Sequence, residues 1–214
     1  MREENNRRKE FEDIAMEHIN SLYSMAIRLV FNKEAAEDLV QETYLKAYRF
    51  FDTFQKGTNI KAWLFKILRN TFINKYRKTV NLPGEVFYED VESVHSHLSF
   101  KQEGDSGELT DTLESKYNDL GNLMDDDIKR AIESLPVEYK EAILLSDVEE
   151  LSYTDIAEIT NVPIGTVKSR LNRGRKLLQK SLWEYAKDRG FIKRGKRWFV
   201  FKQLSTFTRF WIRK

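Results

Sequence analysis

Apolar residues recur at helical spacing along most of the chain. Between about residues 10 and 31 they fall near helical spacing, which predicts helical structure with a buried face. The apolar positions of this stretch are Phe11, Ile14, Ile19, Leu22, Met25, Ala26 and Leu29. Asn32 then suits the cap of a further helix. We predict that the inner positions of that helix are Ala36, Leu39, Val40, Thr43, Ala47 and Phe51.

A third helical pattern covers residues 58–78 and has two faces. One face is a normal buried stripe made of Ala62, Phe65, Leu68, Phe72 and Tyr76. The other steps by four and three positions and consists of Trp63, Ile67, Asn70, Asn74 and Arg77. Such a face suits nucleic acid, because a ring can stack on a base, amides can bond to base edges and cations attract phosphate. Trp63 and Ile67 could equally pack against another helix, so this pattern alone leaves both interpretations open.

The periodicity stops over residues 79–125, where Gly, Ser, Asp and Glu collect, and this predicts an acidic linker. Helical spacing returns after it and leads into LSYTDIAEITNVPIGTVKSRLNRGRKLLQK, residues 151–180. Ser152 and Asp155 have the spacing of a capping box, and Asn161 tolerates the left-handed conformation of a tight turn. Two short helices joined in this way predict a helix-turn-helix, whose second helix fits the DNA major groove.

The second helix of this motif has inward and outward positions. Pro163 suits its entry, and Val167 and Leu171 are expected to point inward. We predict that the outward polar positions contact DNA, and these are Thr166, Lys168, Ser169, Arg170, Arg173 and Arg175.

Composition narrows the fold class. With nine Gly and three Pro in 214 residues, a turn-rich β protein is disfavoured, and we predict an all-α fold. The sequence lacks the run of about 18 apolar residues that a membrane span requires, and its N-terminus lacks the apolar core of a signal peptide. The absence of cysteine excludes disulfides and thiolate metal sites. It fits a reducing cytoplasm, where we expect the protein to act.

Charge is distributed in blocks, although the totals of 36 Lys and Arg and 34 Asp and Glu nearly cancel. Residues 54–80 hold 7 basic and 0 acidic side chains, residues 81–130 hold 4 and 13, and residues 161–214 hold 16 and 2. Two cationic regions separated by an acidic one predict two contacts with a single polyanion. Residues 58–78 contain no carboxylate for i,i+4 pairing, so we expect their counter-charge to come from another molecule.

The residues for enzyme chemistry are missing. His95 and His97 fall in the acidic linker without Cys or a partner His nearby, so we interpret them as solvated side chains rather than metal ligands. The sequence has no phosphate-binding Gly loop, no Ser, His and Asp arrangement and no thiol nucleophile. We therefore predict a protein that is not an enzyme and that needs neither a metal nor a cofactor.

Three motifs together resemble one known family. They are DLVQETYLKAYRFF (38–51), AWLFKILRNTFINKYRK (62–78) and LPVEYKEAILLSDVEELSYTDIAEITNVPIGTVKSRLNRGRKLL (135–178). Their order and separation are similar to those of extracytoplasmic-function (ECF) sigma factors, small members of the bacterial sigma-70 family. The similarity covers about residues 10–182. It implies a dissociable subunit that binds RNA polymerase core and directs promoter-specific transcription initiation by recognising the −35 and −10 elements.

The resemblance also implies a domain order and partners. The expected regions are a sigma-2-like domain (1–80), the acidic linker (81–125), a sigma-4-like domain with the helix-turn-helix (126–182) and a basic, aromatic extension (183–214). We predict that the extension packs on the sigma-4 domain and offers cations to promoter phosphates; docking of an anti-sigma factor or of the polymerase is the competing interpretation. The implied partners are the clamp helices and flap region of the polymerase, promoter DNA and an anti-sigma factor.

Site residues follow from the same resemblance. The first motif is similar to the helix that docks on the clamp helices, and its candidate contacts are Asp38, Gln41, Glu42 and Arg49. The loop Asp52–Asn59 and the helix after it resemble the elements that capture the −10 region and help to open it. The candidates there are Asn59, Lys61, Trp63, Ile67, Asn70, Asn74 and Arg77. The helix over 164–178 resembles the reader of the −35 element, through the outward positions already named.

A second hypothesis comes from a different class of protein. A helix-turn-helix regulator would bind a palindromic operator as a symmetric dimer, with its N-terminal half sensing or dimerising. That hypothesis gives no role to the motifs at 38–51 and 62–78.

Overall fold

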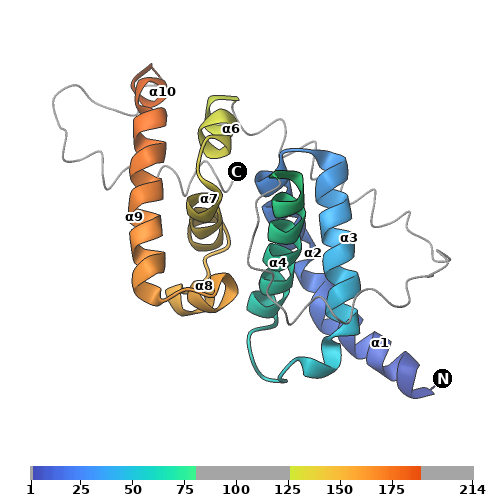
Figure 1. Ribbon diagram of the computed structural model, residues 1–214. Helices are drawn as coiled ribbons and strands as arrows, with labels where there is room; N and C mark the ends of the chain where they lie inside the picture. The colour runs from blue at the N-terminus through green and yellow to red at the C-terminus, as the bar shows by residue number, and fades with distance from the viewer. Residues whose placement is uncertain (1, 81–125, 189–214) are drawn as a thin grey trace.

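The computed structural model describes residues 2–80 and 126–188, which form two helical halves (Figure 1). The N-terminal half (2–80) contains α1 (Arg2–Ala15), the 3-10 turn η1 (Met16–His18), α2 (Ile19–Val30), α3 (Lys33–Arg49), the 3-10 turn η2 (Phe51–Thr53) and α4 (Ile60–Val80). The C-terminal half (126–188) contains α6 (Asp126–Glu133), α7 (Val137–Ile143), the π-helical turn η4 (Leu144–Val148), α8 (Tyr153–Thr160), α9 (Ile164–Ser181) and α10 (Trp183–Asp188). The described residues form helices and no strand, which confirms the predicted all-α class for them.

Two predicted regions lie partly or wholly beyond the described residues. The acidic linker, including His95 and His97, lies outside them, and so do residues 189–214 of the basic extension. The first residues of the extension form α10, in which Tyr185 and Ala186 are buried.

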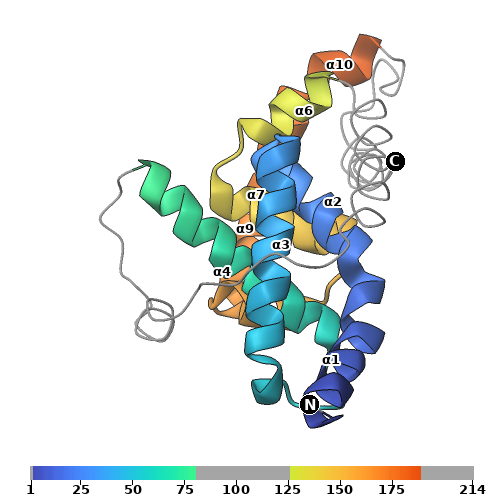
Figure 2. The ribbon, with the colours of Figure 1, turned by 90° about the vertical axis from the view of Figure 1, so that its right-hand side faces the viewer.

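Helix α2 packs against α3 and α4, and α3 packs against α4 (Figure 2). Phe31 ends α2 in the left-handed conformation, with φ of 52°, and lets the chain turn directly into α3. The side chain of Asn32 caps α3 by accepting a hydrogen bond from the backbone N of Ala35 at 2.8 Å, as predicted. All six predicted inner positions, from Ala36 to Phe51, are buried.

Two details of the N-terminal half differ from the sequence-based expectations. The pattern over residues 10–31 corresponds to two helices, because the step from Ile14 to Ile19 is five residues and η1 changes the phase of the buried face there. Tyr76 was expected in the buried stripe of α4 but is 39% exposed. It lies one turn beyond Phe72, near the end of the helix, and covers the Phe72 ring at 5.9 Å while its other side faces solvent.

The predicted helix-turn-helix is confirmed in α8 and α9. Ser152 and Asp155 form both bonds of the capping box at the start of α8. Asn161 ends α8 in the left-handed conformation with φ of 51°. Val167 and Leu171 are each 1% exposed, so the inner face of α9 is the predicted one.

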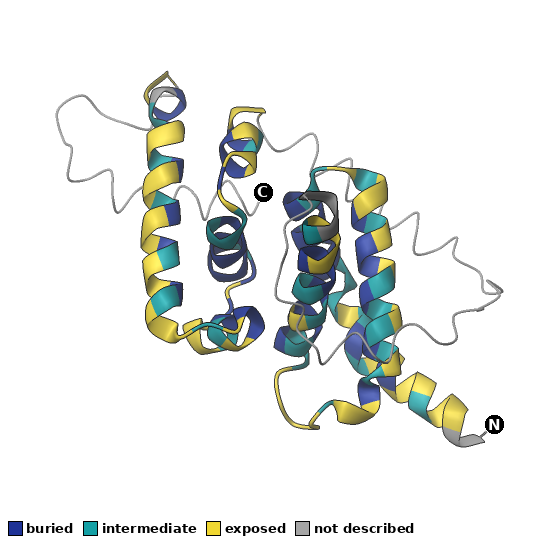
Figure 3. Cartoon of the chain, viewed as in Figure 1, coloured by how far each residue is buried: buried dark blue, intermediate teal, exposed yellow. Residues whose placement is uncertain are grey.

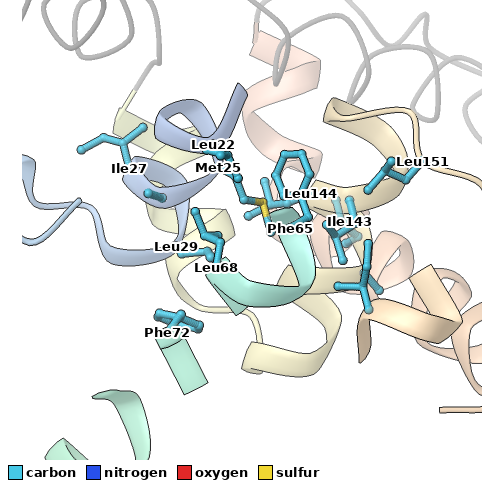
Figure 4. Packing of buried hydrophobic residues seen from close by; sticks show 14 of the residues in the cluster. Leu22, Met25, Ile27, Leu29, Phe65, Leu68, Phe72, Ile143, Leu144 and Leu151 are labelled. Carbon is cyan, nitrogen blue, oxygen red and sulfur yellow. The ribbon is translucent and has the colours of Figure 1, made fainter. Parts of the chain in front are cut away.

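One hydrophobic cluster runs through both halves. The ring of Phe65 in α4 lies beside Leu144 of η4 and Met25 of α2 (Figure 4). Figure 3 shows buried residues on the facing sides of the helices and exposed residues along the outer side of α9. Fully burying a side chain of this kind contributes about 1.5–3 kcal/mol. The two halves therefore pack as one unit in this structure, with α4 against α8.

Gly174 of α9 faces α7 closely enough to test the packing within the C-terminal half. A Cβ added there would lie 2.8 Å from Ile143 Cδ1 and 3.1 Å from Tyr139 Cβ, both on α7. Gly174→Val should therefore lower the free energy of unfolding by about 1–3 kcal/mol, measured by chemical denaturation. Gly165→Val is the matched control, since a Cβ at Gly165 meets nothing within 4 Å. Equal losses for both variants would contradict this account of Gly174.

Candidate nucleic-acid interface

The loop between α3 and α4 leads into the face that was predicted to bind DNA. Residues 52–59 are exposed except for the half-buried Phe54, and Gly57 turns the loop with φ of +88°. Asn59 then caps α4, because its Oδ1 accepts a hydrogen bond from the backbone N of Ala62 at 3.1 Å. The ring of Phe54 contacts that of Trp63 at a centroid distance of 5.2 Å. The half-buried Trp63 ring therefore stands beside an exposed loop at the first turn of α4.

The structure brings the predicted second face of α4 together along one side of the helix. Trp63, Ile67, Asn70 and Arg77 are half-buried, and Asn74 is exposed. Trp63 and Ile67 pack partly against the hydrophobic cluster, so the two interpretations left open by the sequence are compatible. These side chains support the fold and still keep surface that a base can contact.

The expectation that the cations of residues 58–78 take their counter-charge from another molecule is wrong for three of them. Lys61 Nζ lies 3.1 Å from Glu149 Oε2 and donates to the Glu149 backbone oxygen at 3.1 Å. Arg69 Nε lies 3.3 Å from Glu141 Oε1. Lys75 Nζ lies 2.8 Å from Glu42 Oε2. The carboxylates come from elements far away in the sequence, and the i,i+4 criterion does not detect partners of this kind.

Glu141 and Glu149 are almost completely buried between the halves, with 1% and 5% of their side chains exposed. Burial raises the pKa of Glu149, and Lys61 only partly offsets this effect. Burial raises the pKa of Glu141 in the same way, with Arg69 opposing it. Arg28 of α2 is buried near Glu149, and burial lowers its pKa to about 10. A carboxyl group whose pKa is raised by folding contributes its full stability at pH values below its pKa in the unfolded chain. That contribution is lost as the pH rises through its pKa in the folded protein.

The outward face of α3 carries most of the predicted polymerase contacts. Asp38, Gln41 and Arg49 are exposed and share one side of the helix. Leu45 lies between them, is 65% exposed and was missed by the sequence reasoning. Single exposed apolar residues are common on protein surfaces, so nothing in the sequence singled out Leu45 among the outward positions of this helix.

Glu42, the fourth predicted contact on α3, differs from the other three. It is half-buried, with its carboxylate 3.0 Å from Lys46 and 2.8 Å from Lys75. Burial alone would raise the pKa of Glu42, but its hydrogen bonds to Lys75 and Lys46 outweigh burial and lower it. Glu42 therefore joins α3 to α4 within this half.

The outer side of α9 presents the predicted −35 residues. Lys168, Ser169 and Arg173 are exposed, whereas Thr166 and Arg170 are half-buried. The Ser169 hydroxyl donates to the Thr166 backbone oxygen at 2.9 Å, which leaves its oxygen as an acceptor. The exposed row continues with two residues that the sequence reasoning missed and that follow Lys168 at steps of four, namely Asn172 and Lys176.

Arg175 has a partner inside the C-terminal half. Its Nε donates to Asp147 Oδ2 at 3.0 Å and its Nη2 to Asp147 Oδ1 at 2.5 Å. The Asp147 side chain is 1% exposed. This two-pronged ion pair fixes α9 to η4, so the guanidinium is engaged in the fold rather than pointed away from it.

Comparison with known proteins identifies the family. The family described as Sigma-70 region 2 matches residues 14–81, and the one described as Sigma-70, region 4 matches residues 125–178. Over 165 residues the chain is 36% identical to the ECF RNA polymerase sigma factor EcfG of Rhodopseudomonas palustris, covering 77% of this chain and 81% of that protein. The chain belongs to the ECF sigma factors. It is a sigma subunit that directs promoter-specific transcription initiation, as the resemblance implied.

Further relatives agree with this assignment. The ECF sigma factor SigW of Bacillus subtilis is 32% identical over 172 residues, which cover 80% of this chain and 88% of SigW. Among solved structures, the sigma factor RpoE of Bartonella quintana, in complex with the anti-sigma factor NepR, is 35% identical with a TM-score of 0.57. That match covers 81% of this chain and 97% of the Bartonella chain.

The region 2 match covers the motifs at 38–51 and 62–78 and so accounts for them as parts of a sigma factor. The competing operator-binding hypothesis gives these motifs no role. Sigma factors are DNA-binding regulators that act with RNA polymerase. In the described part of this ECF sigma factor, no helix is both long enough and apolar enough to cross a membrane.

Proposed function

We propose that this ECF sigma factor uses one surface to bind the polymerase and two to recognise the promoter, and that it acts in the cytoplasm. The outward face of α3 docks on the clamp helices of the polymerase, and Leu45 adds an apolar contact to its polar row. The loop 52–59 and α4 capture the −10 region. Helix α9 reads the −35 element through Lys168, Ser169, Arg170 and Arg173, while the C-terminal half meets the flap region.

The observation that carries the −10 assignment is the position of Trp63. Its ring is half-buried against Phe54 at the start of a helix that has no acidic residue in its first turn. Taking a base out of the stack costs a few kcal/mol, and stacking on an aromatic ring returns about 1–3 kcal/mol per base. Asn70 and Asn74 can bond to base edges from the same side, and Lys66 is exposed toward solvent for phosphate.

The contact between the halves covers cations of α4 that could otherwise meet promoter DNA. Lys61 and Arg69 are engaged by Glu149 and Glu141 of the C-terminal half. We therefore propose that the halves separate before α4 accepts promoter DNA, with binding to the polymerase supplying the free energy. An anti-sigma factor completes the proposed partners, because the Bartonella relative was solved in complex with one.

Reconstitution with bacterial core polymerase tests this function. The wild-type holoenzyme should select promoters with paired −35 and −10 elements from a library, whereas the protein alone should bind them weakly. Tight binding of the protein alone to a palindrome would contradict the sigma assignment.

Trp63→Ala tests the −10 role on a selected promoter. The variant holoenzyme should form the closed complex but open the −10 region at least tenfold more slowly, because one base loses its stacking partner. Permanganate reactivity of unpaired thymines measures opening. Tyr76→Ala is the control, since Tyr76 is an exposed aromatic at the other end of α4. Wild-type reactivity of Trp63→Ala would mean that Trp63 only supports the fold.

A further inference from the structure

Helix α1 presents one face to the loop that is proposed to capture the −10 region. The family match begins at residue 14, so most of α1 lies before it. Arg7, Glu10 and Phe11 are three and four residues apart and therefore share a face of the helix. Both views of the ribbon place α1 beside the chain that leaves α3 (Figures 1 and 2).

Arg7 joins the end of α3 to the start of the loop. Its Nη2 donates to the backbone oxygen of Tyr48 at 2.9 Å and, at 3.4 Å, to that of Arg49, the last two residues of α3. Its Nε donates to Asp52 Oδ1 at 3.0 Å, and its guanidinium lies over the Tyr48 ring at 4.9 Å. A guanidinium suits this place because the last carbonyls of a helix lack intrahelical partners and carry partial negative charge.

Phe11 and Glu10 contact the same loop at two further points. The Phe11 ring is 5% exposed and meets Phe51 edge-on at 5.2 Å. Phe51 stacks on Phe54 at 6.3 Å, and Phe54 contacts Trp63 at 5.2 Å. An aromatic path therefore leads from α1 to the ring at the start of α4. Glu10 forms an ion pair with Lys56, four residues farther along the loop than Asp52.

We propose that this face of α1 braces the −10 capture loop and that Arg7 is its positioning residue. The inference rests on the proposed function of the loop. Residues 52, 53 and 55–59 are exposed and have little packing of their own. Ordering such a segment on binding is entropically unfavourable, and a loop held in place beforehand avoids that loss. The contacts at residues 48, 52 and 56 hold it at successive points.

The test compares Arg7→Ala with Arg8→Ala in complete holoenzymes. Arg8 is the matched control, because it is the adjacent arginine on the same helix, has 70% of its side chain exposed and pairs with Glu12 within α1. The first readout is affinity for a single-stranded oligonucleotide carrying the −10 sequence of a promoter selected with the wild-type holoenzyme. The second is permanganate reactivity on the duplex promoter. Arg7→Ala should lose about tenfold in both, the factor expected for one charge-assisted hydrogen bond, with unchanged core affinity. Arg8→Ala should match the wild type.

Three results would overturn the brace. The first is equal behaviour of the two alanine variants. The second is a salt dependence for Arg7→Ala that falls by about 0.7 in slope, the value for a lost contact with a single-stranded phosphate. The third is wild-type activity of Arg7→Lys, because lysine keeps the charge but cannot bond Asp52 and the Tyr48 carbonyl as a fork. A wild-type holoenzyme that fails to open any promoter would instead refute the proposed function.

Discussion

Glu149→Lys should separate the two halves of the free protein. The new ammonium group would lie beside Lys61 and near Arg28, in place of the carboxylate that meets them now. A buried charge without a partner costs about 3–5 kcal/mol, which shifts the equilibrium between joined and separated halves by more than about a hundredfold. The chain has no cysteine, so single cysteines placed at the exposed positions Glu34 and Lys176 can carry a donor and an acceptor dye. Energy transfer between them should fall.

Two control variants sharpen this result. Glu149→Gln should loosen the contact less than Glu149→Lys does, because an amide of the same shape adds no positive charge beside Lys61 and can still accept a hydrogen bond from it. Glu158→Lys makes the same charge change on an exposed position of α8 and should leave energy transfer unchanged. If Glu149→Lys keeps the wild-type energy transfer and melting temperature, the contact between the halves does not depend on this pair, and the proposed masking of Lys61 is wrong.

Opening the halves should also change DNA binding. Glu149→Lys without polymerase should bind a single-stranded −10 oligonucleotide more tightly than the wild type does, because Lys61 is released. The increase should disappear when Lys61→Ala is added. A gain that persists in the double variant would come from the added positive charge and not from unmasking.

The local features of this fold were predictable because their causes lie within a few residues of one another. The caps at Asn32 and Ser152 each rest on a side chain and a backbone group three positions away, and the turn at Asn161 rests on a backbone bond to Ala157, four positions away. The helix-turn-helix followed from these signals together with the inward spacing of Val167 and Leu171. A single sequence is enough for such features.

The pairing of charges was not predictable, because it depends on how distant segments meet. Arg69 and Glu141 are 72 positions apart, and Lys61 and Glu149 are 88 apart. A helix without carboxylates of its own therefore looked unneutralised in the sequence. The exposure of Tyr76 was missed for a related reason, since periodicity finds the side of a helix but not how far its neighbours cover it.

Arg175→Ala should destabilise the C-terminal half, whereas the loss of the exposed Arg173 on the same helix should not. The substitution leaves Asp147, with 1% of its side chain exposed, without the two-pronged partner it now has. A buried ion pair broken on one side costs about 3–5 kcal/mol, and the partial exposure of Arg175 places this site at the lower end, about 3 kcal/mol. Chemical denaturation of the free protein measures the loss. Asp147→Asn in the same chain should restore part of it, because a buried amide is less unfavourable than a buried carboxylate.

Arg173→Ala is the matched control, two residues earlier on the same helix and exposed. It should unfold within about 0.5 kcal/mol of the wild type. In the holoenzyme it should lose about 1–3 kcal/mol of binding at one −35 position if Arg173 contacts a base. The two measurements then distinguish the arginines: the free energy of unfolding changes on loss of Arg175, and promoter selectivity changes on loss of Arg173. If Arg175→Ala unfolds like the wild type but binds every promoter sequence more weakly to the same extent, Arg175 contacts phosphate and its pairing with Asp147 does not support the fold.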